Sequence, residues 1–124
     1  GINLEVDELP YVLGNKYQLE QVLMNLILNA RDAMQRYDTL TIRAFAENDQ
    51  VIVHVEDTGS GIAAEVIDNI FEPFISTKEH GSGLGLFISY GIIQNHKGEI
   101  EVASEVGTGT RFTLTLPTSS VAEH

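Results

Sequence analysis

Two asparagines, one aspartate and three glycine-rich segments are the residues of this chain whose types and spacing could do chemistry. Asn25 and Asn29 lie four positions apart, so on a helix their amides would be neighbours one turn apart. Apolar residues recur at three- and four-residue spacing through the same stretch, which places both amides at the border of a core-facing surface. Such an amide needs a partner, either backbone or a bound ligand, although two solvated amides are the ordinary alternative.

Three Gly-x-Gly segments follow this stretch: Asp57-Thr-Gly59-Ser-Gly61, Gly81-Ser-Gly83-Leu-Gly85 and Gly107-Thr-Gly109-Thr110. The second of them opens an expected helix, where backbone N–H groups and the helix dipole can bind phosphate without formal positive charge. Taken singly, each segment is equally consistent with glycines that only form a turn or start a helix.

Asp57 ends an alternating run in which it shares a face with Val51, Val53 and Val55. If that face is the core, a carboxylate ends a buried strand and needs a donor. It could accept a hydrogen bond from a ligand N–H group. It could equally bond to the backbone of its own Thr-Gly-Ser-Gly turn.

Composition limits the classes of ligand. The chain has 124 residues, 7 Lys and Arg against 18 Asp and Glu, and a formal charge of −11, which argues against a nucleic-acid partner. An anionic ligand must then be held by backbone amides, a metal ion or a few placed cations. There is no cysteine, no apolar run of the roughly 20 residues that span a bilayer, and no visible signal peptide, so we expect a soluble piece from a reducing compartment.

The elements that position these residues follow from hydrophobic periodicity. We predict a strand over 2–6, a long helix capped by Asn15 and running to about Arg36, and a hairpin whose strands meet around 47–50. A short helix over 63–70, a mobile loop over 75–82, a helix over 84–96 and a second hairpin around 106–110 follow. The last helix is expected to be closed by Lys97-Gly98 and to bury Leu84, Phe87, Ile88, Gly91, Ile92 and Asn95.

This order predicts an α+β fold, a two-layer α/β sandwich in which a mixed, mostly antiparallel sheet is covered on one face by three helices. We expect one domain over residues 1–117, followed by a tail over 118–124 without recognisable features. The histidines at 54, 80, 96 and 124 lack metal-ligand spacing and are expected at the surface or in loops.

In their order along the chain, the Asn-x-x-x-Asn helix and the three glycine segments resemble the N, G1, G2 and G3 boxes of the catalytic, ATP-binding domain of bacterial sensor histidine kinases. These domains are of the GHKL type and have the Bergerat fold. The resemblance implies ATP and Mg²⁺ as cofactors, with Asn25 and Asn29 catalytic and Asn29 the metal ligand. The residues that it implies for nucleotide binding are Asn25, Asn29, Asp57, Gly59, Gly61, Ile62, Lys78, Gly81, Gly83, Leu84, Gly85 and Thr110.

The resemblance also implies a reaction and its partners. The domain would donate the γ-phosphoryl group of ATP to a histidine on a separate dimerisation domain of the same parent kinase, and a response-regulator receiver domain would act downstream. By the same resemblance we expect a cytoplasmic location, with a parent that could be anchored in the inner membrane. The isolated domain is expected to be a monomer.

One position departs from the family pattern. Many members carry Lys three residues after the second N-box asparagine, whereas this chain has Asp32, and Arg31 projects away from the asparagine border. The phosphate contacts are therefore in doubt, and Lys78 or His80 could supply them instead. Phe71 and Phe74 match the family's F box, although plain core packing explains them equally well.

Two other classes of enzyme share part of this pattern. GHKL-type ATPases and anti-sigma-like serine kinases carry a Glu general base one turn before the metal-binding asparagine; here that place is Asn25, whose amide cannot accept a proton at neutral pH. Asp57-Thr-Gly-Ser is also the motif of aspartic proteases. Those proteases are almost entirely β, so they have no place for the two longer helices.

Overall fold

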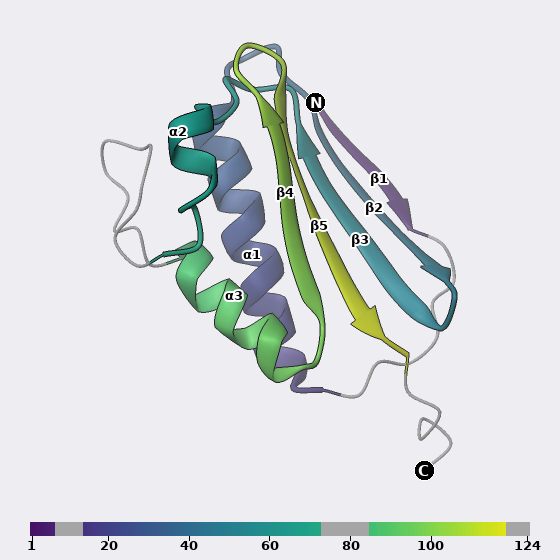
Figure 1. Ribbon diagram of the computed structural model, residues 1–124. Helices are drawn as coiled ribbons and strands as arrows, with labels where there is room; N and C mark the ends of the chain where they lie inside the picture. Colours follow the sequence, from purple (N-terminus) through teal and green to yellow (C-terminus); the bar gives the residue numbers. More distant parts are fainter. Residues whose placement is uncertain (7–13, 73–84, 119–124) are drawn as a thin grey trace.

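The structure is a computed structural model that describes residues 1–6, 14–72 and 85–118 (Figure 1). The elements follow the predicted β-α-ββ-α-α-ββ order. They are β1 (Ile2–Val6), α1 (Lys16–Ala33), β2 (Leu40–Glu47), β3 (Gln50–Asp57), α2 (Ala64–Ile67), α3 (Gly85–Asn95), β4 (Glu99–Glu105) and β5 (Gly109–Pro117). None of the described helices is both long and apolar enough to cross a bilayer.

The strands form one five-stranded sheet in the order β1-β2-β3-β5-β4. β1 pairs with β2 in parallel, and the other neighbours are antiparallel. The three described helices cover one face of this sheet, as Figure 1 shows. The predicted two-layer α+β sandwich with a mixed, mostly antiparallel sheet is therefore confirmed.

The core lies between α1 and the inner face of the sheet. Val22, Leu26 and Ala30 come from successive turns of α1, and each is at most 4% exposed. They pack with buried residues of the strands, including Val55 of β3 and Phe112 of β5. The apolar spacing that predicted a core-facing helix therefore marks the correct face.

The start of α1 is the predicted one. The Asn15 side chain caps the helix by accepting hydrogen bonds from the backbone N–H groups of Tyr17 and Gln18. The backbone N–H of Asn15 donates to Nε2 of His96 at 2.9 Å, and Nδ1 of His96 lies 2.8 Å from the carbonyl of Ile92. His96 thus ties the start of α1 to the end of α3, a role that the sequence did not suggest.

The end of α1 corrects the prediction. The helix ends at Ala33 and not near Arg36, because Met34 is extended, with ψ at 152°. The carbonyl of Ala33 accepts a hydrogen bond from the backbone N–H of Ser60, so the loop after β3 takes the place of a further helical turn.

The helix predicted over 63–70 is also shorter. Only Ala64–Ile67 is α-helical, and tighter turns continue it, with the N–H of Asn69 on the carbonyl of Val66 and the N–H of Ile70 on that of Ile67. No side chain caps its start. Ile70 still reaches the core at 3% exposure, so the segment packs as expected although only its Ala64–Ile67 part is α-helical.

The buried face of α3 was predicted correctly at Ile92 and wrongly at the other described positions. Phe87 and Ile88 are 44% and 39% exposed, Gly91 is exposed, and so is Asn95. Ile92 is buried as predicted, and the other buried residues are Ser89 and Ile93. α3 carries apolar residues on all of its sides, so their spacing does not identify one buried face. The hydrogen bond from the Asn25 amide to Ser89 Oγ helps to determine which face is buried. The predicted Leu84 lies outside the described residues.

The predicted closing turn after α3 forms, but its two residues exchange roles. Lys97 takes the positive φ, at 61°, whereas Gly98 does not. A Cβ on Gly98 would lie 2.4 Å from the carbonyl oxygen of Thr115. Gly98 therefore serves the close approach of the chain to β5.

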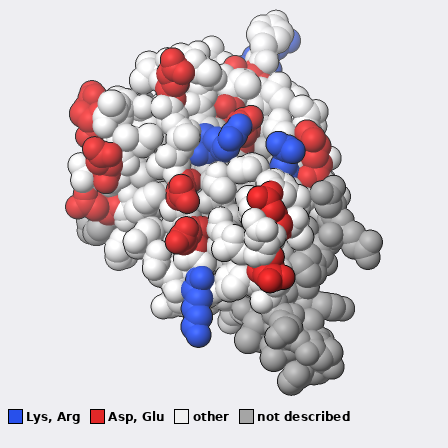
Figure 2. Space-filling model, turned by 45° about the vertical axis from the view of Figure 1, so that its right-hand side comes forward, with Lys and Arg blue, Asp and Glu red and all other residues white. Residues whose placement is uncertain are grey.

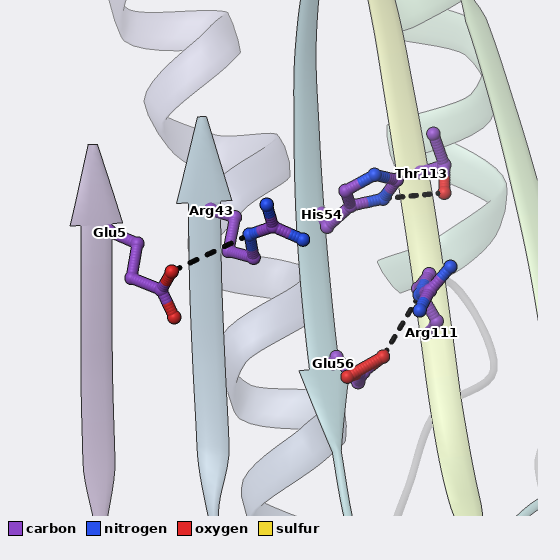
Figure 3. Close-up of polar contacts among 6 residues, drawn as sticks. All are labelled: Glu5, Arg43, His54, Glu56, Arg111 and Thr113. Atoms are coloured by element: carbon purple, nitrogen blue, oxygen red, sulfur yellow. Dashed lines mark hydrogen bonds and ion pairs between the residues drawn. The ribbon is translucent and has the colours of Figure 1, made fainter. Parts of the chain in front are cut away.

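The outer face of the sheet carries polar pairs in register across neighbouring strands (Figure 3). Arg43 Nε lies 3.7 Å from Glu5, and Arg111 Nε donates to Glu56 at 2.9 Å. His54 is half-buried on β3, 3.0 Å from the hydroxyl of Thr113; burial and then Arg111 and Arg43 lower its pKa. Figure 2 shows acidic side chains spread around a few basic ones, in keeping with the net charge of −11.

Candidate functional site

The first part of the site is a polar row across the ends of three strands. In the sheet register, Asp57 of β3 lies opposite Thr110 of β5, which lies opposite Ser104 of β4. Asp57 and Thr110 are each 5% exposed, and Ser104 is half-buried. These residues interrupt an otherwise apolar inner face at one end of the sheet.

Asp57 is where the sequence placed it, at the end of a strand and facing the core. Its Oδ1 accepts a hydrogen bond from the backbone N–H of Gly59 at 2.8 Å, so it does bond to its own turn. Burial raises the pKa of the Asp57 carboxyl, while hydrogen bonds with the backbone of Gly59 and Thr110 act in the opposite direction. None of the ion pairs among the described residues includes Asp57, so it is a buried acid without an ion-pair partner in that part of the chain.

The glycines around Asp57 are there because the backbone is crowded. A Cβ on Gly59 would lie 2.5 Å from the carbonyl oxygen of Ala33, and one on Gly109 would lie 2.0 Å from that of Asp57. Gly61 has φ at 79°, a conformation that side chains disfavour, and a Cβ there would meet Glu105. The loop after β3 is therefore held between the end of α1 and the turn that joins β4 to β5.

Ser104 is a site residue that sequence reasoning missed. Its Oγ accepts from the backbone N–H of Ile62 at 2.7 Å, donates to the carbonyl of Gly109 at 3.0 Å, and lies 2.8 Å from Oγ1 of Thr110. A hydroxyl at the inward position after Ile100 and Val102 was the available signal, because alternation puts all of them on one face. The predicted Ile62 is 7% exposed and packs into the core.

The second part of the site joins α1 to α3. The Asn25 side-chain amide donates to the carbonyl of Gly85 at 3.2 Å and to Oγ of Ser89 at 3.1 Å. Asn25 is therefore not a solvated amide, because its partners are the first turn of α3 and a fully buried hydroxyl. Gly85 is the first residue of α3, so Asn25 fixes the position from which that helix starts.

Asn29 lies one turn further along α1 and behaves differently. It is half-buried and makes no hydrogen bond to any residue of the described part of the chain. Its amide oxygen is thus available as a ligand. Asp32 and Arg31 are exposed and lie 4.0 Å apart, so Arg31 does not replace the missing lysine beside the asparagines.

An open hollow of about 410 Å³ lies at the end of β3, β4 and β5. Its lining comprises Glu56, Asp57, Thr58, Ala103, Ser104, Glu105, Thr108, Gly109, Thr110 and Arg111. The predicted residues Lys78, His80, Gly81, Gly83, Leu84 and Phe74, and the loop over 75–82, lie outside the described residues. Phe71 packs against the core, with its ring 5.4 Å from that of Tyr90 and 6.2 Å from that of Phe112.

Comparison with known protein families identifies the family of this chain. A profile described as "Histidine kinase-, DNA gyrase B-, and HSP90-like ATPase" matches residues 14–120, which is most of the chain. The chain belongs to this ATPase family. The match runs from the residue before the cap of α1 to beyond β5, and so includes both asparagines and the whole polar row.

Within the family the chain is of the histidine kinase catalytic-domain type, as the resemblance predicted. It is 42% identical over 111 residues to sensor histidine kinase ZraS of Escherichia coli strain K12, covering 90% of this chain and 24% of ZraS. It is 41% identical over 120 residues to sporulation kinase E of Bacillus subtilis strain 168, covering 95% of this chain and 16% of that kinase.

Solved structures agree with the sequence comparison. The catalytic domain of histidine kinase ThkA, in a nucleotide-free form, matches with a TM-score of 0.83 and 32% identity, over 94% of this chain and 78% of that one. Full-length ShkA in complex with AMPPNP matches with a TM-score of 0.83 and 31% identity, over 96% of this chain and 26% of ShkA. The chain spans about a quarter or less of the length of ZraS and of sporulation kinase E.

Proposed function

We propose that this domain binds ATP with Mg²⁺ and donates the γ-phosphoryl group to a histidine on a separate dimerisation domain of its parent kinase. In that transfer the bond between the γ-phosphorus and its bridging oxygen breaks, an imidazole nitrogen of the acceptor takes the phosphoryl group, and ADP leaves. A receiver domain is the expected next acceptor, and the cytoplasm, where ATP is available, is the expected location. The ATP analogue bound in ShkA, a relative of the same fold, supports the choice of nucleotide.

Asp57 supports the adenine side of this proposal. Its carboxylate has two oxygens and several acceptor positions, and the Gly59 N–H uses one position of Oδ1. A buried acceptor that remains is what an adenine amino group requires, and Thr110 lies directly opposite on β5. The crowded glycine backbone around Asp57 fixes the direction of the carboxylate without a ligand.

Asn29 supports the metal side. Mg²⁺ prefers oxygen ligands and keeps several waters, so one amide oxygen together with phosphate oxygens is a sufficient set. The described residues contain no group of three or more His, Asp or Glu that could hold a metal ion alone. Asn29, with no hydrogen bond to a described residue, fits a shared site. The bound ion would neutralise phosphate charge, which an acidic domain needs.

The amide of Asn25 favours transfer of the phosphoryl group to a protein over hydrolysis of ATP. Its amide hydrogens are both used to hold the first turn of α3, and an amide cannot take a proton from water. Glu20, the nearest acid in sequence, is exposed and lies on another turn of α1. In the described part of the chain, α1 therefore lacks the general base that an ATPase or a serine kinase of this fold would carry at the position of Asn25.

The exposed side of α3 supports docking of the acceptor domain. Phe87, Ile88 and Tyr90 are 39–44% exposed, and the helix carries no charged residue although the chain is rich in them. A Cβ on Gly91 would have nothing within 4 Å, so the fold itself does not require glycine there. A small residue between exposed apolar ones fits close approach of a partner helix beside the start of α3.

Calorimetric titration of the domain with ATP-Mg²⁺ and with GTP-Mg²⁺ tests the nucleotide. We expect ATP to bind with micromolar-range affinity and GTP to bind far more weakly, because its ring presents a carbonyl where adenine has an amino group. Asp57→Asn should remove ATP binding while the circular-dichroism spectrum is retained, since an amide can still accept from Gly59. Unchanged affinity in that variant contradicts the adenine role of Asp57.

Phosphotransfer is tested with the separately expressed acceptor domain of the parent. We expect an acid-labile, base-stable phosphoprotein, as a phosphoramidate requires, together with very slow ATP hydrolysis by the catalytic domain alone. Asn29→Ala should remove the phosphoprotein signal, and Asn25→Glu should raise hydrolysis by supplying a base. Brisk hydrolysis by the unmodified domain that Asn25 substitutions leave unchanged would favour the ATPase alternative instead.

A further inference from the structure

β1 is an edge strand whose apolar side chains are not covered. Its register with β2 puts Ile2, Leu4 and Val6 on the same face as the inward residues of that strand. They are nevertheless 75%, 69% and 54% exposed. The helices pack over β3 and β4, whereas β1 lies at the far edge of the sheet from α3 (Figure 1). Three aliphatic side chains in alternation are therefore exposed beside a sheet edge that pairs with no other described strand.

β1 also lacks the features that normally protect an edge. It contains no Pro and no Lys, and its one-to-one register with β2 from Ile2 to Val6 leaves no bulge. Its single charge, Glu5, lies 3.7 Å from Arg43 on the outer face (Figure 3). The outer backbone groups of this strand pair with no described strand and can thus accept another strand.

We propose that β1 pairs with β1 of a second copy of this chain, antiparallel and centred on Leu4. In this register Ile2 lies opposite Val6 of the second copy, and Leu4 lies opposite Leu4. Every aliphatic side chain meets another on one face, and Glu5 meets Asn3, so no like charges are opposed. The strand is self-complementary, as a two-fold interface requires, and this does not depend on the proposed function.

We expect this pairing of two β1 strands to be weak. Five residues a side bury less than the roughly 1,200 Å² of a stable specific interface, and two chains of charge −11 repel each other. The domain is therefore a monomer when dilute and dimerises at high concentration, with tighter association as salt screens the repulsion.

Sedimentation at increasing protein and salt concentration measures the proposed association. Charged substitutions of Leu4, which lies on the proposed two-fold axis, test where the two strands meet. Leu4→Lys and Leu4→Glu should each abolish association, because each places two like charges face to face. An equimolar mixture should associate again, as a Lys–Glu pair forms. Val106→Lys and Val106→Glu, at a residue 67% exposed in the β4–β5 turn, are controls that should leave association unchanged. No association of the wild-type domain at any concentration, or none in the mixture, overturns the proposal.

Cross-linking tests the register itself, since the chain has no cysteine of its own. Opposed residues of an antiparallel pair have Cα atoms about 4.5–5.5 Å apart, within disulfide reach. Under mild oxidation, Leu4→Cys should form covalent dimers at least tenfold faster than Asn3→Cys. The matched Asn3→Cys lies opposite Glu5 of the second copy, which puts its own counterpart beyond the roughly 7 Å limit for a disulfide. Equal rates for the two variants contradict pairing centred on Leu4.

Discussion

Glycines cluster at both parts of the candidate site, but only one cluster is explained by the fold. At the end of β3, a Cβ on Gly59 or Gly109 would come within 2.5 Å of a backbone carbonyl oxygen. In α3, the nearest atom to a Cβ on Gly85 is 3.8 Å away, in Asn25, and Gly91 has none within 4 Å. The backbone packing of the first region requires glycine. Among the described residues nothing crowds a Cβ at the glycines of the second region, which fits the proposed approach of a ligand or a partner there.

The largest effect is expected from Gly109→Ala, which puts a Cβ against the carbonyl oxygen of Asp57 at a φ of 140°. We expect a loss of roughly 3 kcal/mol or more in the free energy of unfolding, measured in urea. Gly107→Ala is the control, since Gly107 has a φ of 86° but nothing within 4 Å, and it should cost only about 1 kcal/mol. Equal losses would mean that strain in φ, and not crowding, accounts for the glycine at 109.

Asn25→Ala comes next, because it removes two hydrogen bonds and leaves the Ser89 hydroxyl buried without that donor. The expected loss is roughly 1–3 kcal/mol, measured by denaturant unfolding. Asn29→Ala is a matched control on the same helix, one turn away, and should cost less than about 1 kcal/mol because Asn29 has no hydrogen bond in the described part of the chain. If the two losses were equal, Asn25 would not be the residue that joins α1 to α3.

Asp57 gives a pH dependence whose sign follows from its raised pKa. A carboxyl whose pKa is higher in the folded than in the unfolded chain favours folding at low pH, and this contribution is lost as the pH rises through the folded-state pKa. Asp57→Asn cannot ionise, so its free energy of unfolding should rise relative to wild type between roughly pH 4 and 7. A difference that is constant across this range would contradict burial as the cause of the shift.

The smallest effects on stability are expected where the glycines have room. Gly91→Ala should stabilise the domain by about 0.5–1 kcal/mol, the usual gain at an exposed helix position, and Gly85→Ala should be nearly neutral. If ligands require these glycines, Gly85→Ala lowers ATP affinity in calorimetry and Gly91→Ala slows transfer to the acceptor domain. Unchanged binding and transfer would remove the functional contrast between the two regions.

The sequence predicted most of the fold because its main signals are local. Alternation identified the strands, and the spacing through Val22 and Leu26 identified the face of α1. The face of α3 could not be found in this way, because a hydrogen bond from Asn25, sixty-four residues earlier, holds Ser89 in the core. The end of α1 was missed for a similar reason, since the N–H of Ser60 takes the carbonyl of Ala33. Both errors concern partners that are distant in sequence.

The candidate site also divides into features that local sequence signals predict and features that depend on residues distant in sequence. Asp57 and Thr110 were predicted individually, yet their position as opposite residues on neighbouring strands follows only from the order of strands in the sheet. Ser104 joins them through the same register, and a polar residue in an apolar alternation was its only local sign. The prediction that Asn25 and Asn29 are neighbours needed only the helical repeat. The difference between them, that Asn25 has hydrogen-bond partners among the described residues and Asn29 has none, depends on how α3 packs against α1.

The position of β5 between β3 and β4 has a consequence for how the chain folds as it is synthesised. β5 follows both neighbours in sequence, and it brings Phe112, Leu114 and Leu116 into the core. Until it leaves the ribosome, β3 has one unpaired edge and β4 has no antiparallel partner, so the sheet and its core cannot close. We therefore expect nascent chains halted before β5 to expose a sticky strand edge and to depend on chaperones, while release of nine more residues, Gly109–Pro117, allows cooperative folding.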